Sequence, residues 1–265
     1  MLVRNTSKAD SERISMDKPV AVVLAAGKGS RMNSDLPKVL CEVCGRPMIH
    51  FVLEALQAAG VGRMFVVVGY RDEDVRSELE ELPEVEFVLQ EEQLGTGHAV
   101  QVCRNNLLKH DGAVVVVAGD SPMLQSDSAR ALLDEYAKSR PACILGTLHR
   151  EDPTGLGRIV RDSNGDFCGI VEEKDATSEQ RKITEVNMST YVFDCQELLG
   201  ALEQIKDNNE QKEYYLTDCP GILKNNGKDV RALPVLKSCE SFSINTVDEL
   251  AIVEQEMQRM RFKQD

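Results

Sequence analysis

The sequence predicts an α/β fold, a doubly wound and mostly parallel sheet that carries a small β-rich insertion. In the first half, short continuous apolar runs alternate with segments whose apolar residues recur at helical spacing. From about Arg150 to Glu185, glycines, aspartates and short β-like segments replace that pattern. We therefore expect a single domain over residues 18–262, with the insertion at about residues 150–186 and a polar tail over residues 1–17.

Continuous apolar runs indicate strands that are buried on both faces, as parallel strands usually are. Four such runs are Val20–Leu24, Met64–Val68, Val85–Leu89 and Ala113–Ala118. The helices expected between and after them span residues 48–59, 72–82, 96–108 and 126–138, with Thr96 as a helix cap. The strand–helix alternation predicts right-handed crossovers.

The second half mixes short strands and helices. Asn164-Gly165 separates two alternating segments, 157–161 and 167–172, and this dipeptide is typical of a hairpin turn. We then expect strands at 187–193 and 230–235, and helices at 195–205 and 217–225. Thr246-Val-Asp-Glu249 resembles a capping box that opens a last helix to about Phe262.

Composition excludes several classes of function. The 265-residue chain has a net charge of −13, which argues against a nucleic-acid-binding surface. No run approaches the roughly 20 apolar residues that cross a bilayer, so we expect no membrane association. The polar first residues lack the apolar core of a secretory signal, so we expect a cytoplasmic protein.

The eight cysteines offer one candidate metal or redox motif, Cys41-x-x-Cys44. A zinc site would need a second such pair or a close pair of histidines, and the sequence has neither. Most of the other cysteines lie in apolar runs, where a thiol packs as a small hydrophobe. We interpret all eight as structural and expect no disulfides.

The stretch Leu24–Met32 (LAAGKGSRM) follows the first predicted strand, at the end where α/β sheets bind ligands. Gly27 and Gly29 allow a tight turn whose amides can converge on an anion. Arg31 adds a planar fork for phosphate oxygens, and Lys38 a mobile point charge. The pattern is neither a dinucleotide-binding fingerprint nor a P-loop. It predicts phosphate binding; the alternative is a tight turn beside surface cations.

This stretch resembles the nucleotide-binding signature of the sugar-nucleotide pyrophosphorylases. Within them, the sequence is most similar to the uridyltransferase domain of the bacterial bifunctional N-acetylglucosamine-1-phosphate uridyltransferases. The resemblance runs from about Val20 to about Leu250. Further segments that carry it are LQEEQLGTGHA (89–99), AGDSP (118–122), DPTGLGRI (152–159), GIVEEKD (169–175), EVN (185–187), EYYLTD (213–218) and IN (244–245).

The resemblance implies a Rossmann-like nucleotidyltransferase fold and a role for each matching residue. Backbone groups that face the uracil and ribose would come from Leu24, Ala25, Ala26 and Gly27. The base pocket would be completed by Gln90, Gly95 and Thr96. The triphosphate would be held by Gly29, Arg31 and Lys38, of which the two cations would be catalytic. Without the resemblance, Gln90 would be interpreted as a surface side chain at a strand end.

For the sugar phosphate, the resemblance indicates Gly157, Glu172 and Asn187, with Thr154 as a possible addition. Lys174 and Arg158 are candidate phosphate-neutralising cations. Asp120 follows a buried strand and projects from its C-terminal end, where a carboxylate near a triphosphate is a natural Mg²⁺ ligand. The resemblance adds Asn245 as the second ligand and Mg²⁺ as the cofactor. The alternative for Asp120 is a cap on the following helix.

The implied reaction is Mg²⁺-dependent uridylyl transfer from UTP to N-acetylglucosamine 1-phosphate, which gives UDP-N-acetylglucosamine and pyrophosphate. We expect these small molecules as partners, and no specific protein partner. Transfer to glucose 1-phosphate or N-acetylmuramic acid 1-phosphate, or use of CTP, is one alternative. A non-catalytic nucleotide-sugar-binding protein is another.

Two departures from the family pattern concern the sugar and the domain content. Ala118 replaces a usual tyrosine, and Met188-Ser189 replaces Thr-Gly, both near the expected sugar pocket. No hexapeptide repeats follow Asn245, so we expect the uridyltransferase part without the β-helical acetyltransferase domain.

Overall fold

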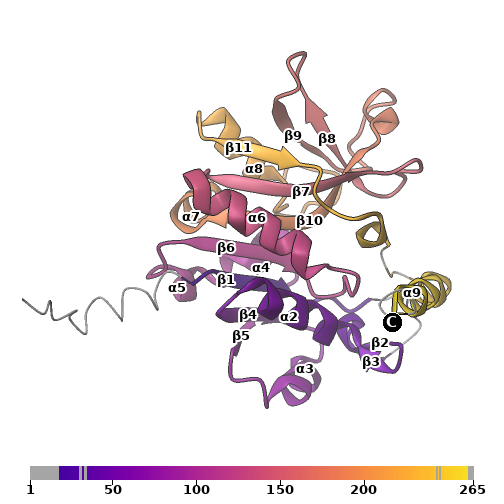
Figure 1. Ribbon diagram of the computed structural model, residues 1–265. Coiled ribbons are helices and arrows are strands. Elements are labelled where there is room, and N and C mark those ends of the chain that lie inside the picture. Colours follow the sequence, from indigo (N-terminus) through magenta and orange to yellow (C-terminus); the bar gives the residue numbers. More distant parts are fainter. Residues whose placement is uncertain (1–17, 30–31, 33–34, 243, 245, 262–265) are drawn as a thin grey trace, which may run out of the picture.

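A nine-stranded sheet with helices on both faces forms the centre of the molecule (Figure 1). It is seen in a computed structural model that describes residues 18–29, 32, 35–242, 244 and 246–261. Along the sheet, the order is β11 (Val230–Leu233), β7 (Cys143–His149), β10 (Glu185–Asp194), β6 (Ala113–Ala118), β1 (Val20–Leu24), β4 (Arg63–Val68) and β5 (Val85–Leu89). Strands β8 (Gly157–Arg161) and β9 (Phe167–Val171) extend it from β10. The mostly parallel α/β fold is thus confirmed.

Helices cover the two faces of the sheet in two layers. One layer consists of α2 (Met48–Ala59), α3 (Asp72–Leu79) and α6 (Ser126–Ser139). The other consists of α4 (Thr96–Gln101), α5 (Arg104–Leu107), α7 (Cys195–Leu202) and α8 (Asp218–Asn225). Short 3₁₀ turns occur at η2 (Lys38–Leu40), η3 (Gln180–Lys182) and η4 (Ser238–Ser241), and β2 (Glu42–Val43) pairs with β3 (Arg46–Pro47). Among the described residues, no helix combines the length and apolar character needed to cross a bilayer.

Strand β1 explains why its sequence is apolar at every position. Val20 and Val22 pack into the core on the α4–α7–α8 face, while Ala21 and Val23 pack into the core on the opposite face. Successive side chains of a strand point to opposite faces, so a strand with helices on both sides needs apolar residues throughout. The four predicted parallel strands are all present, at or within one residue of the predicted ends.

Three helical and strand predictions need correction. The helix expected over 96–108 is broken into α4 and α5, and Gly95 rather than Thr96 is the residue before it. The Thr96 hydroxyl instead accepts a hydrogen bond from Leu216 N at 3.0 Å. Helix α3 ends at Leu79, three residues early. Strand β7 was not predicted, because its Gly146-Thr147 pair interrupts the apolar run of an otherwise buried strand.

Strand β10 changes partner along its length. On one edge it pairs with β7 throughout, and on the other its end, Thr190–Asp194, pairs antiparallel with β6. Its beginning, Val186 and Asn187, pairs with β8 instead. A bulge separates the two parts, and Ser189 within it has φ 53°. The β-rich insertion is therefore hydrogen-bonded into the main sheet through β8.

The C-terminal segment is held at both of its ends. The Glu240 carboxylate is buried and accepts hydrogen bonds from Ser128 Oγ at 2.5 Å and Lys237 N at 2.7 Å, which attach η4 to α6. The predicted capping box is present, because Thr246 N donates to Glu249 Oε2 at 3.0 Å and Glu249 N to Thr246 Oγ1 at 3.2 Å. It opens α9 (Val247–Arg261), which lies beside β2 and β3 (Figure 1).

Leu56→Ala should lower the free energy of unfolding by about 2–5 kcal/mol, because the fully buried side chain would leave a cavity between α2 and the sheet. Urea denaturation followed by circular dichroism measures the change. Leu108→Ala is the matched control: that side chain is 51% exposed, so we expect a change within about 0.5 kcal/mol. Equal unfolding midpoints for the two variants would contradict the packing described here.

Candidate active site

The C-terminal ends of β1 and β6 lie side by side and form one end of the candidate site. Leu24 is in register with Ala118, and Gly119 N donates to Leu24 O at 2.8 Å. A Cβ at Gly119 would lie only 3.0 Å from that carbonyl oxygen, so the close approach favours glycine. The ends of β1 and β6 are thereby held against each other.

Lys38 and Asp120 form an ion pair at this end, with Nζ 2.6 Å from Oδ2. The Lys38 side chain is 15% exposed and that of Asp120 is 26% exposed, so both groups still reach solvent. Gly29, at φ 65°, packs on the stem of Lys38: a Cβ there would lie 2.6 Å from Lys38 Cβ. The glycine-rich loop, a predicted catalytic cation and a predicted metal ligand therefore come together.

The helix-cap alternative for Asp120 is wrong, because α6 begins at Ser126 and is preceded by Gln125. Two further predicted residues, Arg31 and Asn245, lie outside the described residues. Their assignments stay predictions.

The proposed base-binding residues form a second group at the ends of β1 and β5. Ala25 N donates to Val67 O, and Ala26 O accepts from Tyr70 N, while Gly27 is exposed. Gln90 is only 3% exposed, so the surface interpretation of this side chain is wrong. Its Nε2 lies 3.2 Å from Gly95 O and 3.0 Å from His98 Nδ1. The Gln90 carboxamide is thus oriented by the turn that follows it.

That turn is attached to a segment more than a hundred residues later in the chain. Gly97 N donates to Tyr214 O at 2.7 Å, and Tyr214 N donates to Leu94 O at 2.8 Å. Gly95 has φ 111°, and a Cβ there would lie 2.6 Å from Tyr214 O. Only glycine fits both the backbone conformation and the space.

The three residues predicted for the sugar phosphate meet around the start of β8. A Cβ on Gly157 would lie 3.5 Å from Asn187 Cβ and 3.6 Å from Glu172 Oε1. Gly157 also pairs directly with Asn187 across β8 and β10. Residues separated by 15 positions or more in the sequence are therefore neighbours in space.

Glu172 lies in an unfavourable place for a charge. Burial raises the pKa of its carboxyl, a hydrogen bond from Thr217 lowers it, and the nearby carboxylates of Asp175 and Asp218 raise it further. Burial likewise raises the pKa of Asp218, with Asp175 adding to the effect. Perturbed carboxyl groups in a cleft are a common property of functional sites.

A cleft of about 540 Å³ is lined by residues of the base-binding and sugar-phosphate groups. Among the predicted site residues, Leu24, Thr96 and Glu172 line it. Its wall also contains Gly155, Val116, Glu173, Lys174, Ser189, Tyr191, Gln211, Glu213, Tyr215, Leu216 and Thr217. The sequence assigned no role to the hydroxyl-bearing residues among these, although Ser189 stands out as a departure from the family near the expected sugar pocket. The segment 213–218 was noted only as similar to the family, and it lies in no regular element before α8 begins.

The two candidate phosphate-neutralising cations, Arg158 and Lys174, lie in different surroundings. Arg158 is 1% exposed and donates to Glu173 Oε2 at 2.7 Å and to the carbonyl of Leu156, so its role is structural. Lys174 lines the cleft, and its ammonium group donates to Gln211 Oε1. Thr154 is exposed and does not line the cleft.

The cysteines and histidines take part in packing and local hydrogen bonds. All eight cysteines are free thiols, six of them buried. In the described part of the chain, no three His, Cys, Asp or Glu side chains gather as a metal-ligand set. His50 Nε2 lies 2.7 Å from Glu78 Oε1, at the protein surface.

Comparison with known proteins supports the nucleotide-binding interpretation. The family of MobA-like NTP transferase domains matches residues 21–213. The bifunctional protein GlmU of Bacillus licheniformis is 43% identical over 242 residues, which cover 91% of this chain and 52% of that protein. The GlmU proteins of Exiguobacterium sibiricum and Streptococcus mutans are 44% and 41% identical over 239 residues, 90% of this chain and 53% and 52% of theirs.

The chain thus spans about half the length of the curated relatives it matches. The family match covers nearly all of β1, the glycine-rich loop, Lys38, Asp120, and Gly157, Glu172 and Asn187. The chain belongs to the MobA-like NTP transferase family and is a nucleotidyltransferase.

Proposed function

We propose that the chain transfers the uridylyl group of UTP to N-acetylglucosamine 1-phosphate, and that it releases pyrophosphate. The observation that carries this proposal is the position of two groups along one cleft. Leu24 and Thr96 of the nucleotide group and Glu172 of the sugar group line this cleft. The Lys38–Asp120 pair lies in the segments that follow β1 and β6, and Leu24 of β1 and Val116 of β6 both line the cleft. A nucleoside triphosphate and a sugar phosphate need such an arrangement, because their reacting atoms must be held together.

The choice of substrates rests on similarity. Identity of 41–44% over about 90% of the chain joins it to proteins named bifunctional GlmU, and the chain corresponds to one half of them. We assign the uridylyl-transfer half to this chain, because the glycine-rich loop and Lys38 resemble the triphosphate-binding residues of the uridyltransferases. The carboxylate of Glu172 and the amide of Asn187 suit the hydroxyl and N-acetyl groups of the sugar.

The residues present fit a magnesium ion. Asp120 offers a hard carboxylate oxygen, still partly exposed, at the strand end beside the glycine-rich loop. Mg²⁺ often takes one or two protein carboxylates together with phosphate oxygens and water. Asp120 would hold the ion, with Asn245 as the second ligand, and the ion would neutralise charge on the triphosphate. Lys38, now paired with Asp120, would then turn to the phosphates.

The proposed reaction needs no covalent enzyme intermediate. A phosphate oxygen of the sugar phosphate attacks the α-phosphorus of UTP, a new P–O bond forms, and the bond to the pyrophosphate leaving group breaks. Glu172 and Asn187 orient the sugar so that its phosphate approaches in line, while Lys38 and Arg31 offset negative charge around the α-phosphorus. Such catalysis consists of positioning and electrostatic stabilisation.

The proposed function predicts pyrophosphate release with UTP and N-acetylglucosamine 1-phosphate above all other combinations. A panel of four nucleoside triphosphates against N-acetylglucosamine 1-phosphate, glucose 1-phosphate and N-acetylmuramic acid 1-phosphate measures this directly. Faster turnover with glucose 1-phosphate would overturn the sugar assignment alone. No pyrophosphate release with any pair would overturn the proposed function.

Asp120→Asn should leave the fold intact and lower turnover about 10²-fold or more, because a neutral amide is a poorer Mg²⁺ ligand than a carboxylate. Binding of Mn²⁺ in the presence of UTP, followed by electron paramagnetic resonance, should weaken in parallel. Asp127→Asn is the control: that carboxylate is 79% exposed and pairs with Lys237 outside the cleft. Wild-type Mn²⁺ affinity in Asp120→Asn would remove Asp120 from the metal site.

Glu172→Gln should raise the KM for the sugar 1-phosphate about tenfold while the thermal midpoint at pH 8 stays equal to the wild type or rises. Because the pKa of Glu172 is raised in the folded chain, the protonated side chain is the form that the fold favours. Its contribution to stability is present below the unfolded pKa of about 4.3 and is lost as the pH rises through the folded pKa. The difference in thermal midpoint between Glu172→Gln and the wild type should therefore shrink as the pH falls towards 4. Differential scanning fluorimetry across this range measures it, and a lower midpoint for the variant at pH 8 would contradict the burial argument.

A further inference from the structure

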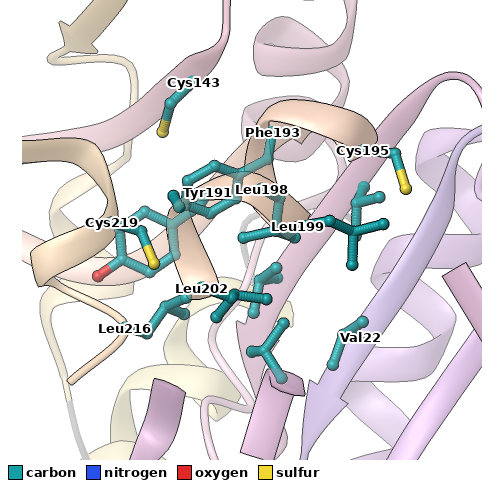
Figure 2. Close-up of a cluster of buried hydrophobic side chains, with 14 of the residues drawn as sticks. Val22, Cys143, Tyr191, Phe193, Cys195, Leu198, Leu199, Leu202, Leu216 and Cys219 are labelled. Atoms are coloured by element: carbon teal, nitrogen blue, oxygen red, sulfur yellow. The ribbon is translucent and has the colours of Figure 1, made fainter. Parts of the chain in front are cut away.

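Tyr191 belongs to the hydrophobic core and to the cleft at once. Its ring is 1% exposed and packs against Phe193, with ring centroids 5.7 Å apart. Figure 2 shows the ring among Phe193, Leu216 and Cys219, with its hydroxyl oxygen at the edge of this cluster. Tyr191 also lines the cleft. A buried phenol requires a polar partner, so the position of the hydroxyl is informative.

Asn187, one of the predicted sugar-phosphate residues, is a partner of the hydroxyl, and the Ser189 side chain is another. Asn187 Nδ2 donates to Tyr191 Oη at 2.7 Å, and Asn187 Oδ1 accepts from Ser189 N at 3.3 Å. The backbone N–H of Ser189 can only donate, so it must face the amide oxygen. The two contacts together specify which way the carboxamide points. Nδ2 carries a second hydrogen, which the contact with Tyr191 does not use.

The contact depends on the β10 bulge. On a regular strand, residues four positions apart lie about 13 Å from one another. The shift in register between Asn187 and Tyr191, with Ser189 at φ 53°, brings the two side chains within hydrogen-bond distance. A positive φ is uncommon at a residue other than glycine, and such backbone strain often occurs at functional sites.

We propose that Tyr191 is a positioning residue for sugar specificity, which holds the Asn187 carboxamide in the orientation that binds the sugar 1-phosphate. This inference rests on the proposed function and deepens it. The phenol acts as a neutral group, because burial and the neighbouring Glu172 carboxylate raise the pKa of Tyr191 far above the working range. The site therefore offers an amide of one fixed orientation to the substrate.

Tyr191→Phe removes one oxygen and keeps the ring, and Tyr136→Phe is its matched control. Tyr136 is also buried, and its hydroxyl donates to Asp194 Oδ2 at 2.8 Å in the packing of α6, outside the cleft. Y191F should raise the KM for N-acetylglucosamine 1-phosphate about tenfold, with kcat and the KM for UTP within about threefold of wild type. It should also lower the ratio of kcat/KM for N-acetylglucosamine 1-phosphate to kcat/KM for glucose 1-phosphate. Y136F should change none of these constants.

A double-mutant cycle separates positioning from general damage. In an Asn187→Ala background, Y191F should add no further loss, because the residue through which Tyr191 acts is already absent. Additive losses, or an unchanged KM in Y191F while the wild type is active, would overturn the proposal. A wild type without turnover in the substrate panel would overturn the proposed function first and this inference with it.

Discussion

The structure of the site depends on the exchange of partner along β10. Its second part completes the main sheet beside β6, and its first part carries β8 and β9 instead. Because the exchange occurs at Asn187–Tyr191, the cleft opens beside the residues that face it. Glu172, which follows β9 of the insertion, and Leu24, at the end of β1, both line this cleft.

Charge is distributed in a way that suits phosphate binding by an acidic protein. With a net charge of −13, the surface as a whole repels a triphosphate, so binding requires a local concentration of donors. Three glutamates and one lysine line the cleft, and Lys38 is neutralised by Asp120. On the proposed function, Asp120 would hold a divalent ion that supplies positive charge, and the Lys38 ammonium group would then pair with the triphosphate. The affinity for nucleotide and that for the ion would then be coupled, as thermodynamic linkage requires.

The fold was more accessible from sequence than the site. Strands such as Val20–Leu24 were predictable because burial on both faces leaves a continuous apolar run, whereas β7 was missed because Gly146 and Thr147, both buried, interrupt its apolar run. The glycine-rich loop around Gly29 and the position of Asp120 at a strand end were also predictable from the sequence. The hydrogen bond between Asn187 and Tyr191 was not, since it depends on a bulge that no local pattern indicates. Arg158 was misjudged for the same reason, because its burial follows from tertiary packing.

Glu172 illustrates how stability and function are opposed in this cleft. A carboxylate beside Asp175 and Asp218, with its pKa raised by burial, destabilises the folded chain at neutral pH relative to a neutral side chain. Its hydrogen bond from Thr217 offsets only part of that cost. A sugar hydroxyl could donate a second hydrogen bond to the same carboxylate and would remove water from around it, so the interaction becomes stronger when the substrate is bound. On the proposed function, the sugar thus adds a second hydrogen bond to a carboxylate whose charge Thr217 stabilises only in part. Asn187 is held by Tyr191 of the same strand, β10, and so has its orientation fixed before the sugar binds.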